Sequence, residues 1–126
     1  MSDGQNDHLI RWAVVLAGLI GAAGIALAAA AAHAGEQVRL LGAASAICVA
    51  NAPALLVLGL AGRRLHLGAL CGALLVLGTV LFAGDVALRA FAGRGLFPMA
   101  APTGGSIVII GWLLLAFGAL LTQRDK

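Results

Sequence analysis

The sequence predicts an all-α integral membrane protein, built as an antiparallel bundle of four transmembrane helices. Of its 126 residues, 62% are hydrophobic and 10% are charged, whereas charged residues make up about 25% of an average soluble domain. Four apolar runs are each about 18–25 residues long, enough to cross about 30 Å of hydrocarbon as a helix. The polar segments between these runs are short, so we expect little of the chain outside the bilayer.

We expect one membrane domain over residues 1–126, with spans at about 12–32, 40–61, 67–91 and 104–121. The first span follows a polar leader and opens on Trp12, an aromatic residue suited to the membrane interface. Small residues along it at helical spacing predict a surface for close approach to another helix; they are Gly18, Ala22, Ala26 and Ala30. The run is longer than a usual signal-peptide core, so we interpret it as a retained span.

The second span carries a polar residue and a proline near its middle. Asn51 at this depth predicts a hydrogen bond to a neighbouring helix, because an amide in hydrocarbon needs a partner. Pro53 removes one backbone donor and leaves the carbonyl of Val49 without its usual partner, so we expect a kink there.

A tight basic turn, Gly62–His66, leads into the third span. Small residues recur in this span every seven positions, with one acid among them, at Cys71, Gly78, Asp85 and Ala92. The face that carries Asp85 is therefore the one that lets a neighbouring helix come close. Gly68 and Gly72 form a GxxxG pattern on roughly the opposite face, but such a match carries little weight in a chain with 18 glycines.

The longest connection, residues 92–103, leads to the fourth span and contains two prolines, Pro98 and Pro102. Its Phe97 and Met99 are suited to dip into the membrane interface. We expect Thr103 to cap the N-terminus of the fourth span. A glycine at every seventh position predicts a close-packing stripe along that span; these are Gly104, Gly111 and Gly118.

The basic residues predict the orientation of the chain. Five lie on the side that holds both termini: Arg11, Arg63, Arg64, Arg124 and Lys126. Three lie on the other side: Arg39, Arg89 and Arg94. Because cytoplasmic segments carry the excess of Lys and Arg, we expect both termini to be cytoplasmic, in a multi-pass protein of the bacterial inner membrane.

Asp85, followed at i+4 by Arg89, is the leading candidate site. A carboxylate at the centre of a membrane helix costs roughly 2.5–3.5 kcal/mol on insertion scales, so Asp85 should face protein and not lipid. It is compatible with an ion pair that fixes helix register, with a carboxylate that handles a proton, cation or ligand, or with a solvated residue at the mouth of a cavity. The spans contain no other acid, which argues against a proton relay.

Asn51 and His33 are the other candidate polar residues. His33 ends the first span, where we expect an interfacial or capping side chain; a soft metal site shared with Met99 is the less favoured alternative. Cys48 and Cys71 would lie about 12 Å apart in depth in antiparallel helices, too far for a disulfide, so we interpret them as packing residues.

The sequence contains no pattern typical of an enzyme. Its Ser and Thr residues have no His or acid at the spacing of a nucleophile and its base. P-loop, HExxH and CxxC motifs are absent. We therefore expect no catalytic activity, no cofactor and no metal. The few basic residues lie at the ends of apolar runs, so we expect no nucleic-acid partner either.

Three segments together resemble a known family. Leu77-Gly-Thr-Val-Leu-Phe-Ala-Gly84 is similar to LGTxLFSGS, and Ala101-Pro-Thr-Gly-Gly105 with Ile110-Gly-Trp112 is similar to TPxGG…GW. Ala28–Ala34 is a weaker match to GAFGAH. The chain thus resembles the small four-helix membrane family described as domain of unknown function 423, related to the transmembrane protein 256 group. This resemblance implies the same architecture and supplies no activity.

Two positions depart from the pattern of that family. Asp85 stands where the family has a small hydroxyl residue, and Asn51 stands where the family usually has a histidine. If these positions form a polar site, the resemblance implies that its chemistry is altered in this chain.

The leading functional hypothesis is a non-enzymatic subunit with a structural or accessory role. It would lie in the lipid bilayer and pack with other membrane-protein subunits or as a homo-oligomer. The alternative is a small transporter or channel-like protein that handles a proton, a cation or a small apolar ligand near Asp85.

Overall fold

The computed structural model describes residues 3–124, without the side chains of Arg63 and of residues 122–124. Within these residues the chain forms two 3₁₀ turns, η1 (Gly35–Gln37) and η2 (Gly62–Arg64), and four long α-helices. The helices are α1 (Asp3–Ala31), α2 (Val38–Ala61), α3 (Gly68–Ala92) and α4 (Ala100–Arg124). All four are long and apolar enough to cross a membrane, so the predicted fold class is confirmed.

Two helices extend well beyond the predicted spans. α1 begins at Asp3 and not near residue 12, so the polar leader adds more than two turns of helix. α4 begins at Ala100, four residues before the predicted start at Gly104. Hydropathy marks where a helix enters hydrocarbon and not where its backbone hydrogen bonds begin, so it misses polar helical turns.

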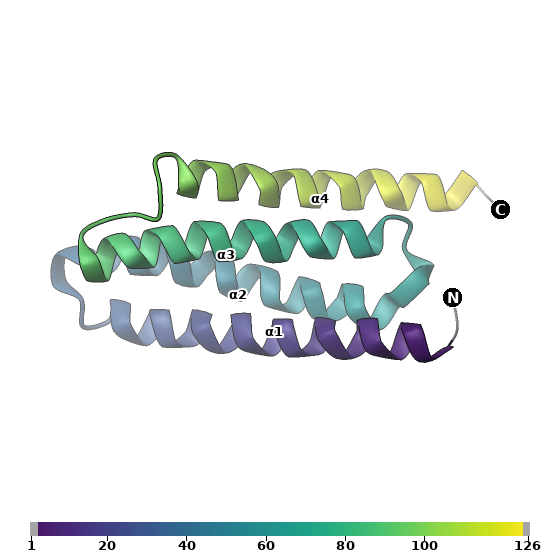
Figure 1. Cartoon of the computed structure of the whole chain (residues 1–126), viewed down its shortest axis with the longest axis horizontal. Coiled ribbons are helices and arrows are strands. Elements are labelled where there is room, and N and C mark those ends of the chain that lie inside the picture. Colours follow the sequence, from purple (N-terminus) through teal and green to yellow (C-terminus); the bar gives the residue numbers. More distant parts are fainter. Residues whose placement is uncertain (1–2, 125–126) are drawn as a thin grey trace.

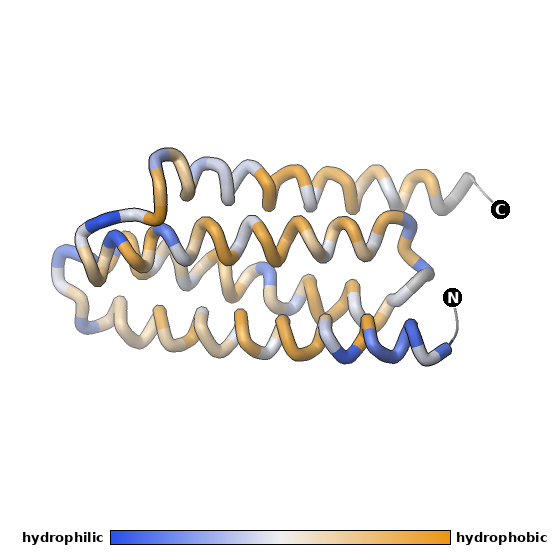
Figure 2. Tube along the Cα trace, viewed as in Figure 1, coloured by the Kyte–Doolittle hydropathy of each residue, from blue (hydrophilic) through white to orange (hydrophobic). Residues whose placement is uncertain are grey.

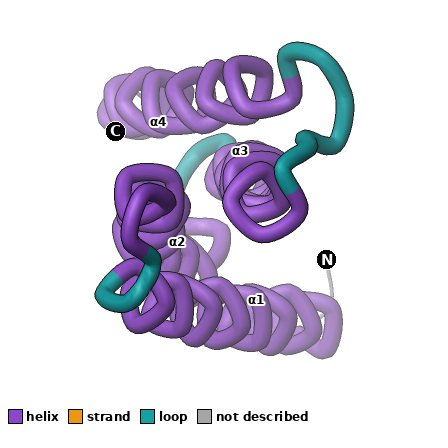
Figure 3. The backbone as a smooth tube through the Cα atoms, turned by 90° about the vertical axis from the view of Figure 1, so that its left-hand side faces the viewer, coloured by secondary structure: helices purple, strands orange, loops and turns teal. Residues whose placement is uncertain are grey.

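The helices lie side by side in the order α1, α2, α3, α4 (Figure 1). α1 packs on α2 and α4 packs on α3, and contact between α2 and α3 joins the two hairpins. Seen end-on, α1 and α4 lie on opposite sides of the central pair (Figure 3). The bundle is therefore open, and each outer helix has a broad face that no other helix of the chain covers.

The hydrophilic segments lie at the two ends of the bundle, and the middle is mainly hydrophobic (Figure 2). One end holds the start of α1, the turn at 62–67 and the end of α4; the other holds the connections at 32–37 and 93–99. Gly62 and Gly93 terminate α2 and α3 with φ values of 57° and 71°. Glycine adopts this conformation without steric cost, which permits the sharp turns.

Glycines let α3 and α4 approach closely. A Cβ atom at Gly78 would lie 2.6 Å from the carbonyl oxygen of Gly104, and a Cβ at Gly104 would lie 2.6 Å from the backbone nitrogen of Phe82. Both predicted stripes are buried apart from Ala92, namely Cys71, Gly78 and Asp85 on α3 and Gly104, Gly111 and Gly118 on α4. These two predicted packing faces are therefore confirmed.

The packed face of α1 differs from the predicted stripe. Its buried residues are Ala17, Ile20 and Gly24, and a Cβ at Gly24 would lie 2.9 Å from the Cβ of Cys48 on α2. The predicted stripe is mostly exposed, at Gly18, Ala22 and Ala26. Small residues occur on every side of this helix, so their spacing alone does not select the side that is packed.

Pro53 and the two cysteines lie within long helices, the proline at an exposed position and the cysteines in the core. α2 continues as one helix from Val38 to Ala61 with Pro53 inside it, so the expected kink does not interrupt the helix. Cys48 and Cys71 are free and buried in the hydrophobic core, as packing residues.

Candidate functional site

Asp85 lies on α3, seven residues before the helix ends at Ala92, or about 10 Å from that end. Its exposed fraction is 0%. The Nε of Arg89 donates a hydrogen bond to its Oδ2 at 2.9 Å, and the two side chains form an ion pair. The predicted pairing of these two residues is therefore confirmed. The Arg89 side chain is 46% exposed, so it covers the carboxylate and keeps part of its own charge at the surface.

The carboxylate of Asp85 also binds backbone from outside its helix. The N–H of Leu96, in the connection between α3 and α4, donates to Oδ1 at 2.7 Å. The N–H of Ala101, in the first turn of α4, lies near this group. The first N–H groups of a helix have no partner within it, and an anion beside them is favoured by the helix dipole. Asp85 thus anchors both the connection and the N-terminus of α4.

The prediction that Thr103 caps the fourth span is wrong. Thr103 lies inside the first turn of α4, where its N–H donates to the carbonyl of Met99, and it is not the N-cap. The carboxylate of Asp85, on another helix, lies beside this turn, and the sequence near the turn gives no signal of that. Gly95 allows the close contact, because a Cβ there would collide with the Asp85 carboxylate and the Arg89 guanidinium.

Asn51 forms a second polar group, at the middle of the bundle. It is 1% exposed. Its Nδ2 donates to the Oγ1 of Thr79 on α3 at 3.0 Å, and its Oδ1 accepts from the Nε1 of Trp112 on α4 at 3.0 Å. The predicted interhelical hydrogen bond of Asn51 is confirmed, and it is one of two. A single side chain thus links three helices at mid-depth.

Sequence reasoning did not identify the two partners of Asn51. Thr79 and Trp112 lie near the midpoints of α3 and α4, as Asn51 does near the midpoint of α2. This shared depth was the signal in the sequence that could have identified them. A polar side chain in hydrocarbon can pair only with another one at the same depth. A third link was also missed: the hydroxyl of Ser45 on α2 donates to the carbonyl of Gly24 on α1 at 2.7 Å.

His33 lies apart from both polar groups. It is exposed in the turn between α1 and α2, whereas Met99 is exposed just before α4. Among residues 3–124, no three His, Cys, Asp or Glu side chains come together as a group that could hold a metal ion. The four candidate residues thus fall into three places: the Asp85–Arg89 pair, Asn51 and the isolated His33.

The chemistry available inside the bundle is limited by how completely its polar atoms are paired. Among the described residues, every buried side-chain nitrogen and oxygen has a hydrogen-bond partner. Neither Asp85 nor Asn51 lines the two grooves described below. The hydrogen bonds of both side chains join their own helices to other segments, which fixes register and depth.

Four helices of this length and apolar composition are those of a multi-pass membrane protein. The model of the family "Protein of unknown function (DUF423)" matches residues 20–105, and the chain belongs to this family. The matched range contains Asn51, Thr79 and Asp85 and ends before Trp112. Comparison with curated proteins and with solved structures gave no match.

Proposed function

We propose that this chain is a non-enzymatic structural or accessory subunit of the bacterial inner membrane. It packs there with other membrane-protein subunits or with further copies of itself. One observation carries the proposal: the buried polar atoms of the described residues are all paired within the chain, while the outer helices keep broad apolar faces uncovered. Such a molecule has little to offer a polar substrate and much surface for other helices.

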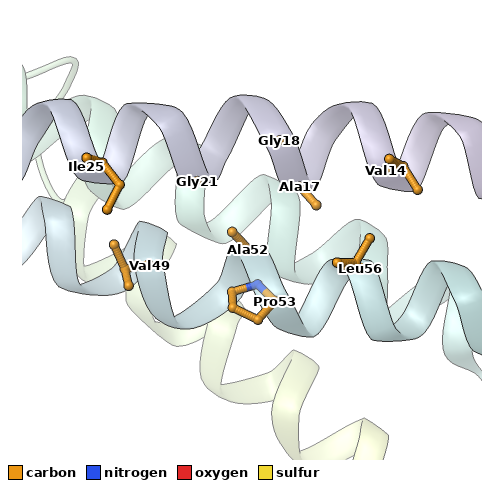
Figure 4. Close-up of a pocket in the computed structure, with 9 residues that line it drawn as sticks. All are labelled: Val14, Ala17, Gly18, Gly21, Ile25, Val49, Ala52, Pro53 and Leu56. Carbon is orange, nitrogen blue, oxygen red and sulfur yellow. The ribbon is translucent and has the colours of Figure 1, made fainter.

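A shallow groove between α1 and α2 supports packing with another helix. Its volume is about 440 Å³ and its lining is apolar. Figure 4 shows Gly18 and Gly21 on one wall and Val49 and Pro53 on the other. A Cβ at Gly18 would have no atom within 4 Å, so the backbone of α1 is open to close approach there. Close approach of backbones is what drives helix association in lipid.

The distribution of charge supports an orientation with both termini in the cytoplasm. The fold places the start of α1, the turn at 62–67 and the end of α4 at one end. Four of the eight Lys and Arg residues belong to these segments, namely Arg11, Arg63, Arg64 and Arg124, against three at the other end. Cytoplasmic segments carry this excess in inner-membrane proteins.

Transport of a proton or cation near Asp85 is less well supported. Both oxygens of the carboxylate are engaged, by Arg89 and by Leu96. A transport site needs a path to each side of the membrane, and neither the α1–α2 groove nor the larger groove beside α3 is lined by Asp85.

Extraction in a gentle detergent with mass determination tests the proposal. We expect a particle heavier than one 12.6 kDa chain, from bound partners or added copies. Replacing Gly18 by Leu should fill the groove and dissociate the particle, whereas Ala23→Leu, at an exposed position on the other side of α1, should leave the mass unchanged. A wild-type particle of one chain with no co-purifying protein would refute the proposal.

A further inference from the structure

A second and larger groove runs between α1 and α3, with α2 as its floor. Its volume is about 830 Å³. Leu9 and Trp12 line it from α1, Leu58 from α2, and Gly72, Val76 and Val80 from α3. α1 and α3 have little direct contact. Seen end-on, α2 lies to one side of both helices and leaves them apart (Figure 3). None of the residues that line the α1–α2 groove lines this second groove.

The length of the groove matches one leaflet of a bilayer. Along α3 it extends from Gly68 to Val80, twelve residues or about 18 Å at 1.5 Å per residue. Half of the hydrocarbon thickness is about 15 Å. The groove begins at the end that holds the termini and stops near the middle of the bundle. A transmembrane helix would need a contact surface through both leaflets, whereas an acyl chain needs one.

The turn at the mouth of the groove carries an exposed arginine. Gly62, Leu65 and His66 of this turn line the groove, and Arg64 is exposed in the same turn without lining it. From α1 the groove presents Asn6, a neutral residue that can donate hydrogen bonds. Asp3 and Asp7 are exposed on the same end of α1, but neither lines the groove. An apolar groove with an exposed arginine beside its mouth, at the membrane surface, is complementary to an anionic phospholipid.

We propose that the groove between α1 and α3 binds one anionic phospholipid from the leaflet at the termini. An acyl chain lies along α3 between Gly68 and Val80. The phosphate group lies at the turn that carries Arg64. The rings of Trp12 and the leucines around it cover the chain from the lipid side. This site is separate from the subunit contacts proposed above, and either proposal can fail without the other.

Native mass spectrometry of the full chain, delipidated in detergent, tests the site. The probes are phosphatidylglycerol and phosphatidylcholine with identical acyl chains. We expect one phosphatidylglycerol to bind at a concentration about fivefold lower than phosphatidylcholine, the factor that corresponds to about 1 kcal/mol per arginine near a membrane surface. Arg64→Gln should remove that preference. Arg39→Gln, an exposed arginine at the other end of the bundle, should keep it.

Filling the groove should abolish binding of both lipids. Gly72→Leu projects a side chain into open space, since a Cβ there has no atom within 4 Å, and Gly42→Leu is the matched control outside the groove. If Gly72→Leu does not fold, as judged by circular dichroism, Ala73→Leu fills the same slot from an exposed position. Equal binding of the two lipids to the wild type, or full phosphatidylglycerol binding by a folded filled variant, would overturn the proposal. A filled variant that changes from dimer to monomer and still binds lipid would also overturn it, because the groove would then hold a second copy of the chain.

Discussion

Asp85 stabilises backbone outside its own helix, α3. Its carboxylate accepts from Leu96 in the connection and lies beside the N–H of Ala101 in α4, and Arg89 closes the remaining side. A buried carboxylate with several donors is held in one place, because removing any donor leaves an unpaired group in an apolar setting. At the residue scale, this acid is therefore a structural anchor for the α3–α4 hairpin.

Replacing Asp85 by Asn should lower the thermal unfolding midpoint in detergent, measured by circular dichroism. The amide keeps one acceptor oxygen but turns an NH₂ group toward a donor, so at least one hydrogen bond and the ion pair are lost. Arg89→Gln should lower the midpoint less, because Arg89 is half-exposed and the bond to Leu96 stays. An unchanged midpoint in Asp85→Asn would show that the carboxylate does not anchor the connection. Proton flux in vesicles should be the same in wild type and variant.

The second prediction at the residue scale concerns Asn51. Asn51→Leu keeps the approximate volume and removes both interhelical bonds, so we expect unfolding in a denaturing detergent to become easier by about 1–2 kcal/mol. Fluorescence of Trp112 reports the loss directly. In a double-mutant cycle with Thr79→Val, the two changes should be non-additive because they share a bond. Strict additivity would contradict the network.

At the scale of elements, glycines on both helices bring the backbones of α3 and α4 together. Gly78 faces the carbonyl of Gly104 and the backbone of Val108 at distances that leave no room for a methyl group. Lipid is as apolar as the helices, so association depends on close packing and not on expulsion of water. The seven-residue glycine spacing on α4 produces this contact, and Asp85 fixes its end.

Gly78→Ala should destabilise the α3–α4 contact by about 1–3 kcal/mol, because the added methyl group overpacks it. Gly72→Ala is the matched control on the same helix. A Cβ there meets no atom within 4 Å, so this change should be neutral or stabilising by up to about 1 kcal/mol through helix propensity. Free energies of unfolding in detergent measure both. Equal effects of the two substitutions would show that crowding at Gly78 does not limit the approach.

At the scale of the whole molecule, the open order of the helices decides which surfaces remain available. α2 and α3 form the centre, and α1 and α4 flank them on opposite sides. The two grooves follow from this arrangement, one between α1 and α2 and one between α1 and α3. A closed bundle with the same four helices would cover the second.

The proposed topology predicts the labelling of single cysteines by a membrane-impermeant maleimide in intact cells. In a background with Cys48→Ala and Cys71→Ala, Gln37→Cys and Phe97→Cys should be labelled, and Gln5→Cys should be protected until the cells are lysed. All three native residues are exposed in the structure. The reverse pattern would overturn the orientation, and labelling of Gln37→Cys without Phe97→Cys would contradict the antiparallel fold.

The sequence by itself determined the four spans, their antiparallel order, the pairing of Asp85 with Arg89 and the packing faces of α3 and α4. These follow from hydropathy and from spacing along a single helix, which are local properties. Only the tertiary structure decided which face of α1 is packed and that Thr79 and Trp112 are the partners of Asn51. It also decided that Asp85 binds the backbone of Leu96 beside the start of α4, which Thr103 does not cap. Each of these depends on how two or more helices are placed against one another. In a chain with small residues on most faces, many such placements are compatible with the same local pattern.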